Sequence, residues 1–307
     1  MDTLGVRRVW KIGICGVAAC CAVACLAQAS KAAATWQSAV ANAARVAPQA
    51  RIVVLSVADG RLLASRHPAE AARTLAYPGS SLKPIGLYGL IAAGRWDPSR
   101  RVACSRKLSV AGHSLNCSHP PGDPMDARQA LAWSCNSYFA AVADALAPGE
   151  LRRLLAPSGL LAQTGLASGE AIADFREPQT PDQARLALLG VEGVRVTPFE
   201  LAAAYRWLAL QFAAHPGSSA TEAVLAGLED SASFGVAGAA GLGGVTVAGK
   251  TGTASAEAGA QSHGWFAGLA PSDAPRVAIV IYLPSGRGAD AARVAAELLA
   301  HSPLRQP

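Results

Sequence analysis

The first strong structural signal in the chain is the run Arg51-Ile-Val-Val-Leu-Ser-Val57. It is typical of a buried β-strand, because it is rich in β-branched and aliphatic residues. Asp59-Gly60 follows, and this dipeptide favours a tight hairpin turn. Residues 61–65 then return as a second strand. The first third of the chain therefore contributes one hairpin to a sheet.

The remaining elements are expected on both sides of this hairpin. Further strands are expected at residues 244–250, 264–269 and 276–283, and helices at residues 32–47 and 289–301. Between them, residues 80–211 are mostly helical in pattern, interrupted by Gly and Pro. We therefore predict an α+β fold: an antiparallel sheet built from both chain ends, flanked by helices, with an inserted all-helical lobe.

The composition indicates a compact globular enzyme and excludes a disordered chain. Of 307 residues, 51% are hydrophobic and 16% are charged, so the chain can bury a sizeable core. The net charge of +6 suits an anionic polymer such as cell wall without requiring one. Since no cluster of Lys and Arg is interleaved with aromatic residues, nucleic acid is not an expected partner.

The N-terminal segment has the pattern of a secretory signal peptide. Arg7, Arg8 and Lys11 precede an apolar run over residues 12–24, and Ala27-Gln28-Ala29 offers a small-x-small cleavage site. We therefore expect an exported protein that works in the periplasm or at the outer face of the cytoplasmic membrane.

Two other interpretations of the same segment stay open. The apolar run could remain as a membrane anchor, although it has few bulky aliphatic residues for a spanning helix. The sequence before Cys20 also resembles a lipoprotein box, which would place a lipid on that cysteine. In either case we expect residues 1–29 to be a signal or anchor and residues 30–307 to be one domain.

Three of the seven cysteines lie outside this segment. Cys104 and Cys117 flank a loop that contains Gly and Ser, and in an oxidising compartment the two are candidates for a disulfide bond. Cys135 would then be a small buried side chain. The six His residues show no spacing typical of metal ligands, so His113, His119 and His263 are interpreted as loop or structural residues, and no metal is expected.

The first of three chemical motifs is Pro78-Gly-Ser-Ser-Leu-Lys-Pro84, at the start of a predicted helix. Ser80 and Lys83 are three positions apart, so on a helix they share one face. A serine hydroxyl becomes a good nucleophile when a base takes its proton, and a lysine with a depressed pKa can be that base. Alone, the motif also fits a capping serine and a surface lysine.

The second motif is Ser134-Cys135-Asn136, just before a predicted helix over residues 138–146. A serine here can relay a proton between a lysine and a leaving amine, and the asparagine can bind a substrate amide. An ordinary helix cap is the alternative for this motif alone.

The third motif, Gly249-Lys-Thr-Gly-Thr253, is expected at the end of a strand. Lys250 and the hydroxyl of Thr251 can bind a carboxylate, and Gly252 lets the backbone approach a substrate closely. An extended segment here can also pair with a peptide as an added strand. A strand that ends in a tight glycine turn is the alternative.

Together and in this order, the motifs resemble those of the serine penicillin-binding proteins and β-lactamases. Cys117–Phe139 is similar to the stretch leading into the second motif of many transpeptidases. Residues 190–205, which contain Val196-Thr-Pro198 and Tyr205, resemble another element of that domain, and His263-Gly-Trp-Phe-Ala-Gly268 resembles the strand after the third motif. The resemblance covers roughly residues 50 to 300 and implies a penicillin-binding transpeptidase domain.

The resemblance also implies a role for each motif residue. Ser80 would be the acylated nucleophile, Lys83 its base, Ser134 the proton relay and Asn136 a ligand of substrate and lysine. The third motif would bind the substrate through Lys250, Thr251, Gly252 and Thr253, and the backbone N–H groups of Ser80 and Thr253 would form the oxyanion hole. No cofactor is implied.

The expected reaction is D,D-transpeptidation of peptidoglycan stem peptides that end in D-Ala-D-Ala, with β-lactams as covalent inhibitors. A D,D-carboxypeptidase or a β-lactamase would share the acylation step, although no dedicated deacylating carboxylate is apparent near the helical lobe. A non-catalytic β-lactam sensor or wall-binding scaffold is a third alternative. The intact motifs argue against a decayed enzyme, and a sensor would also need a signalling membrane domain, of which the sequence gives no sign. Larger transpeptidases carry an extra N-terminal module for which this chain has no room, so a separate glycosyltransferase or wall-synthesis partner is expected.

Overall fold

The fold is described from a computed structural model that places residues 35–120, 122–255 and 261–305. The predicted signal or anchor, residues 1–29, lies outside these described residues. Within them, no helix combines the length and the apolar character needed to cross a membrane.

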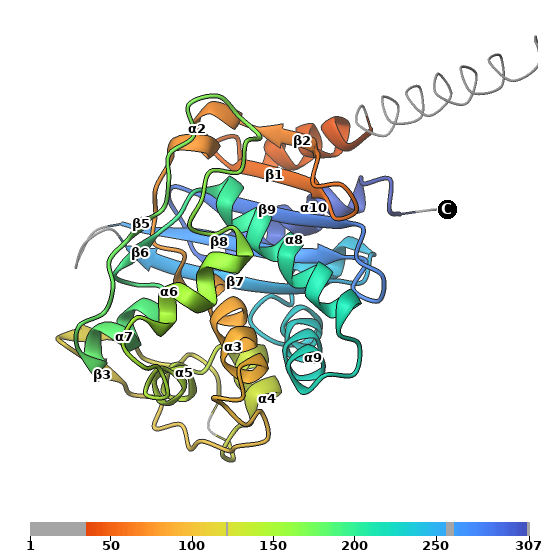
Figure 1. Ribbon diagram of the computed structural model, residues 1–307. Coiled ribbons are helices and arrows are strands. Elements are labelled where there is room, and N and C mark those ends of the chain that lie inside the picture. Colours follow the sequence, from red (N-terminus) through yellow and green to blue (C-terminus); the bar gives the residue numbers. More distant parts are fainter. Residues whose placement is uncertain (1–34, 121, 256–260, 306–307) are drawn as a thin grey trace, which may run out of the picture.

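A five-stranded antiparallel sheet forms the centre of the molecule, with the strand order β2-β1-β9-β8-β7 (Figure 1). The strands are β1 (Arg51–Ser56), β2 (Leu62–Arg66), β7 (Ala248–Ser255), β8 (Ser262–Ala270) and β9 (Val277–Leu283). The first hairpin, β1–β2, joins the C-terminal strands through the β1–β9 pair, where Val53 lies opposite Val280. The sheet is therefore built from both chain ends, which confirms the predicted α+β architecture.

Helices cover both faces of this sheet. Helix α10 (Gly288–Ala300) and a helix over residues 35–46 pack on one face, and α8 (Pro198–Ala214) packs on the other (Figure 1). Successive side chains of a strand point to opposite faces, so Ile279 and Ile281 face α10 while Val280 faces α8. All seven residues of β9 are buried, as expected for a central strand covered on both sides.

The helical lobe is inserted between β2 and β7. Its longer helices are α3 (Lys83–Ala92), α4 (Ala127–Trp133), α5 (Asn136–Ala143), α6 (Glu150–Leu155), α7 (Pro181–Leu188) and α9 (Ser219–Ser233). Its shorter elements, together with those that link it to the sheet, are α2 (Pro68–Arg73), η1 (Gly79–Leu82), η2 (Ala156–Ser158), η3 (Ala240–Gly243), β3 (Ser109–Val110), β4 (His113–Ser114), β5 (Asp174–Phe175) and β6 (Val194–Arg195).

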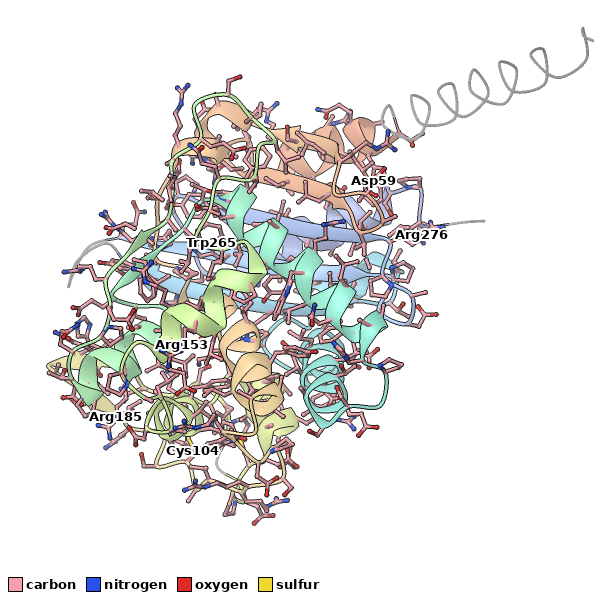
Figure 2. The ribbon with its side chains drawn as sticks, viewed as in Figure 1. Asp59, Cys104, Arg153, Arg185, Trp265 and Arg276 are labelled. Atoms are coloured by element: carbon pink, nitrogen blue, oxygen red, sulfur yellow. The ribbon has the colours of Figure 1, made fainter. Side chains whose placement is uncertain are left out.

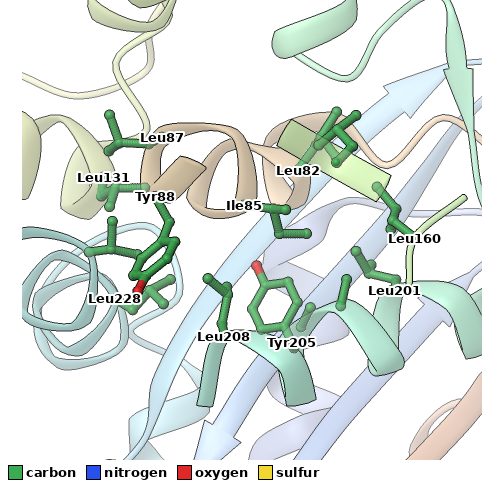
Figure 3. Close-up of a cluster of buried hydrophobic side chains, with 14 of the residues drawn as sticks. Leu82, Ile85, Leu87, Tyr88, Leu131, Leu160, Leu201, Tyr205, Leu208 and Leu228 are labelled. Atoms are coloured by element: carbon green, nitrogen blue, oxygen red, sulfur yellow. The ribbon is translucent and has the colours of Figure 1, made fainter. Parts of the chain in front are cut away.

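Helix α3 is the buried centre of this lobe. It is apolar on nearly all sides, which is the pattern of a helix surrounded by protein. Ile85 and Leu87 are fully buried, and Figure 3 shows them with Tyr205 and Leu208 of α8 in one cluster. Each such aliphatic side chain contributes roughly 1.5–3 kcal/mol through burial. This packing fixes the start of α3, where the first motif lies.

One predicted strand boundary is wrong. The strand expected at residues 244–250 begins only at Ala248, and η3 ends at Gly243. Strand β7 then continues through the third motif to Ser255, so Lys250 lies inside the strand and not at its end. The strand continues because each residue of β7 pairs with a residue of the neighbouring strand β8; Lys250, for example, lies opposite Ala267. This pairing extends a segment whose glycines have little intrinsic strand preference.

Candidate active site

The first motif places Ser80 in η1, directly before α3. Ser80 is half-buried and lines a cleft of about 490 Å³. The second and third motifs contribute Ser134, Asn136, Thr251 and Thr253 to the same cleft. Residues far apart in the sequence therefore meet at one solvent-reachable hollow.

Close backbone packing holds the turn over residues 77–81, here called the Ser80 turn, against β7. A Cβ on Gly79 would lie 2.8 Å from the carbonyl oxygen of Thr253, and Gly79 has a φ of +55°. A Cβ on Gly252 would overlap the carbonyl oxygen of Pro78. Both positions therefore require glycine. At position 252 the need for glycine comes from the packing of the Ser80 turn. The sequence had indicated a different reason, the close approach of a substrate.

Three side chains from outside the motifs hold the same turn by hydrogen bonds. His263 Nε2 and Trp265 Nε1, both on β8, donate to the carbonyl oxygen of Tyr77 at 2.8 and 2.9 Å. The hydroxyl of Tyr205, buried in α8, donates to the carbonyl oxygen of Ser81 at 3.0 Å. Figure 2 shows Trp265 in the sheet behind α8 and α6. His263 is therefore a structural residue, as the sequence suggested.

Lys83 is fully buried and donates hydrogen bonds to the second motif. Its Nζ lies 2.6 Å from Asn136 Oδ1, 3.3 Å from Ser134 Oγ and 3.2 Å from Ser134 O. Burial lowers the pKa of Lys83 from 10.5 to about 8, although the thiols of Cys117, Cys135 and Cys104 act in the opposite direction. With this pKa, about one-tenth of the amine is neutral at pH 7, and a neutral amine can accept a proton.

The second motif is held in place by strained backbone and by a neighbouring loop. Ser134 ends α4 in the left-handed conformation, with a φ of 57°, which turns its carbonyl oxygen and hydroxyl toward Lys83. A non-glycine residue in this region costs roughly 1–2 kcal/mol. Asn136 opens α5, and its Nδ2 donates to Leu115 O at 2.9 Å. The amide oxygen of Asn136 is thereby left to face the lysine.

The third motif supplies a second buried lysine. Lys250 is fully buried, and its Nζ donates to Thr251 O at 3.1 Å. Its pKa lies well below the ordinary value, first because of burial and then because of the positive charge of Lys83. The hydroxyl of Thr253 accepts a hydrogen bond from Gly288 N at 2.9 Å, which ties β7 to the start of α10.

Comparison with known families identifies the chain. Its sequence matches the family described as the penicillin binding protein transpeptidase domain over residues 50–301. The chain belongs to this family. Penicillin-binding transpeptidases bind β-lactams and peptidoglycan substrates and generally work outside the cytoplasm. A search of curated proteins gives no match.

Solved structures of penicillin-binding proteins share the fold. A peptidoglycan glycosyltransferase from Burkholderia ambifaria aligns with a TM-score of 0.76 at 20% identity, over 88% of this chain and 94% of that one. The transpeptidase domain of Burkholderia pseudomallei penicillin-binding protein 3 also gives 0.76 at 20% identity, over 89% and 93%. Pseudomonas aeruginosa PBP2, in complex with WCK 5153, gives 0.72 at 20% identity, over 87% and 75%.

The sequence interpretation missed several residues of this transpeptidase-like site. Tyr205 and Trp265 belong to stretches that resembled the family, yet nothing in the sequence indicated that their side chains hold the Ser80 turn. Arg287, directly before α10, lines the cleft with an exposed guanidinium group. No local pattern marks Arg287, because it reaches the cleft only through the packing of α10 against the sheet.

The candidate disulfide is not formed in this structure. Cys104 and Cys117 carry free thiols, and their Sγ atoms lie 3.5 Å apart, whereas a disulfide bond measures about 2.05 Å. Cys135 is buried, as predicted, but it does not stand alone: its thiol and His119 join the other two cysteines. The spacing of the His residues had not predicted this grouping, because it depends on how the loop over residues 102–119 folds back onto α5.

Proposed function

We propose that this chain is a peptidoglycan D,D-transpeptidase that forms a serine acyl-enzyme on D-Ala-D-Ala stem peptides and is covalently inhibited by penicillin. The observation that carries the proposal is the convergence of Ser80 with a fully buried lysine, Lys83, whose amine is held by Ser134 and Asn136. This arrangement supplies a nucleophile, a base and a proton relay around one cleft.

In the acylation step, neutral Lys83 takes the proton of Ser80 as Oγ attacks the carbonyl carbon of the penultimate D-Ala. The backbone N–H groups of Ser80 and Thr253 stabilise the resulting oxyanion. The C–N bond then breaks, and a proton passes through the hydroxyl of Ser134 to the leaving amine of the terminal D-Ala. Attack by an acceptor amine on the ester forms the cross-link and restores Ser80.

The carboxylate of the terminal D-Ala is bound by Lys250 and Thr251 in this proposal. Burial lowers the pKa of Lys250, and repulsion by the charge of Lys83 lowers it further, so a neutral Lys250 is favoured in the free enzyme. A bound carboxylate would provide the missing counter-charge and raise the pKa of Lys250. Substrate binding is therefore expected to be accompanied by proton uptake at Lys250.

One observation separates the competing enzymatic functions. A β-lactamase needs a base that activates water for rapid deacylation, and none of the described residues that line the cleft is an aspartate or a glutamate. This favours a long-lived acyl-enzyme, as in a transpeptidase or a D,D-carboxypeptidase. A wall-binding scaffold is disfavoured, because binding alone has no use for a buried lysine held by Ser134 and Asn136.

We also propose that residues 1–29 export or anchor the chain and that residues 30–307 form its catalytic domain. Export would place the site beside its polymeric substrate. A separate glycosyltransferase or other wall-synthesis partner would supply the glycan strands, since the described residues account for a transpeptidase domain alone.

The test is labelling of the full chain with a fluorescent penicillin, followed by a denaturing gel, a time-resolved chase and peptide mapping. We expect a stable label on Ser80 that is absent from Ser80→Ala and unchanged in Ser233→Ala, an exposed serine outside the cleft. Rapid loss of label with hydrolysed drug would indicate a β-lactamase, and no label would refute the proposal. A D-Ala-D-Ala peptide with and without an acceptor amine then distinguishes cross-linking from trimming.

A further inference from the structure

Three cysteines and one histidine form a compact cluster beside the second motif. The ligand atoms of Cys104, Cys117, His119 and Cys135 all lie within 4.8 Å of one another. Cys117, His119 and Cys135 are buried, and Cys104 is half-exposed. Figure 2 shows Cys104 in the helical lobe, below the sheet. The catalytic proposal uses none of these four side chains.

The dimensions of the cluster are close to those of a tetrahedral metal site. Four ligands at about 2.0–2.3 Å from a tetrahedral zinc ion lie roughly 3.5–3.8 Å from each other. Cys104 Sγ is 3.5 Å from Cys117 Sγ and 3.3 Å from His119 Nε2. All the separations are within 4.8 Å, so side-chain movements of up to about 1 Å would complete the coordination. A single disulfide would instead leave one buried thiol and one buried imidazole without a role.

The surroundings orient the donor atoms toward a common centre. His119 Nδ1 lies 2.7 Å from the carbonyl oxygen of Pro120, so Nδ1 carries the proton and donates, and the lone pair of Nε2 faces the thiols. This second hydrogen bond is the arrangement that metal-binding histidines usually show. The backbone N–H of Asn136 donates to Cys117 Sγ at 3.1 Å, which stabilises a thiolate.

We propose that Cys104, Cys117, His119 and Cys135 bind one Zn²⁺ ion as a structural site. Three thiolates and one imidazole, without a carboxylate, are the donor set that selects zinc over harder cations. Four protein ligands leave no open position for catalysis, so the ion would hold structure and would not react. The ligands come from the 102–119 loop and from the residue before α5, and the metal would therefore clamp the loop onto that helix.

This clamp would position Asn136, although Asn136 is not itself a ligand. The loop contributes Leu115 O, which accepts from Asn136 Nδ2, and Cys117 Sγ, which accepts from Asn136 N. Both contacts fix the amide whose oxygen lies 2.6 Å from Lys83 Nζ. The metal assignment stands on the cluster alone, whereas its expected effect on acylation rests on the proposed function.

The experiment uses the full chain, purified without chelator from zinc-supplemented cells. The cysteines of the N-terminal segment are replaced by serine in every sample, so that they cannot bind zinc: Cys15, Cys20, Cys21 and Cys25. We expect one zinc ion per chain by mass spectrometry of the metal. X-ray absorption at the zinc edge should show three sulfur ligands at about 2.3 Å and one nitrogen at about 2.0–2.1 Å.

Matched variants test the assignment. His119→Gln and Cys117→Ser should lose most of the metal, and His113→Gln, at a half-exposed histidine of the same loop outside the cluster, should retain it. His119→Gln keeps a side chain of similar volume and tests the site even if Cys117→Ser fails to fold. Removal of zinc by a chelator should lower the melting temperature and slow acylation by penicillin, and added zinc should restore both.

Several results would overturn the proposal. Zinc absent from the parent chain, zinc undiminished in His119→Gln, or a Cys104–Cys117 disulfide recovered under non-reducing conditions would each refute the metal site. An unchanged melting temperature after zinc removal would refute its structural role. Zinc bound as expected in a chain that penicillin never acylates would refute the proposed function and leave the metal site standing.

Discussion

The pH dependence of acylation offers the sharpest test of Lys83 as the base. Burial lowers the pKa of Lys83 to about 8 from its ordinary value of 10.5. Only the neutral amine can take the proton of Ser80, so acylation should rise as the pH passes through this pKa. With a pKa of about 8, the neutral fraction is about one-tenth at pH 7, one-half at pH 8 and nine-tenths at pH 9.

These fractions translate directly into expected rates. The acylation rate constant at saturating penicillin should rise roughly fivefold between pH 7 and pH 8, and by less than about twofold from pH 8 to pH 9. The saturating concentration matters because Lys250 also has a depressed pKa, and its loss of charge would weaken binding of the drug carboxylate. Stopped-flow fluorescence with a labelled penicillin measures acylation apart from this binding effect.

Two variants complete the assay. Lys83→Ala should lower the acylation rate constant by about 10²–10⁴-fold, the usual contribution of a positioned base. Lys107→Ala removes an exposed lysine and should keep both the rate and the pH profile. A rate constant that is flat or falls between pH 6 and pH 9 would refute Lys83 as the base. So would a Lys83→Ala variant that reacts within a fewfold of the parent chain.

The other predictions concern the positioning of Ser80. Gly252→Ala should destabilise the fold by roughly 1–3 kcal/mol in urea unfolding and slow acylation, because the new Cβ would overlap the carbonyl oxygen of Pro78 and lie 3.1 Å from Ser81 N. Gly122→Ala, with open space around the new Cβ, should change stability by less than about 0.5 kcal/mol, and equal effects would contradict the close-approach argument. Tyr205→Phe removes the donor to Ser81 O and should cost about 1–2 kcal/mol, with slower acylation. Unfolding and labelling that match the parent chain would show that this hydrogen bond does not hold the turn.

Much of the architecture follows from local patterns. The hairpin over residues 51–65, the C-terminal strands and the terminal helix are recognisable because alternation, turn dipeptides and helical periodicity are properties of neighbouring residues. The order of the three motifs is equally a property of the chain, and it was enough to indicate the family. Motif recognition also selected Ser80, Ser134 and Asn136, which line one cleft, and Lys83, which is buried and donates to Ser134 and Asn136.

Contacts between distant segments could not be predicted in the same way. The extent of β7 depends on its pairing with β8, and the need for glycine at position 252 depends on the Ser80 turn that packs against it. The positioning role of Tyr205 and the low pKa of Lys83 arise from burial, which no local pattern reports.

The cysteine cluster shows the same division. The sequence suggested a pair, Cys104 and Cys117, because a shared loop makes such a pair plausible. The folded chain adds His119 and Cys135, since the loop turns back onto the start of α5 and brings four donor atoms together. Local sequence determines which side chains are available, and tertiary packing decides which of them meet, because distances between segments are set by the whole core.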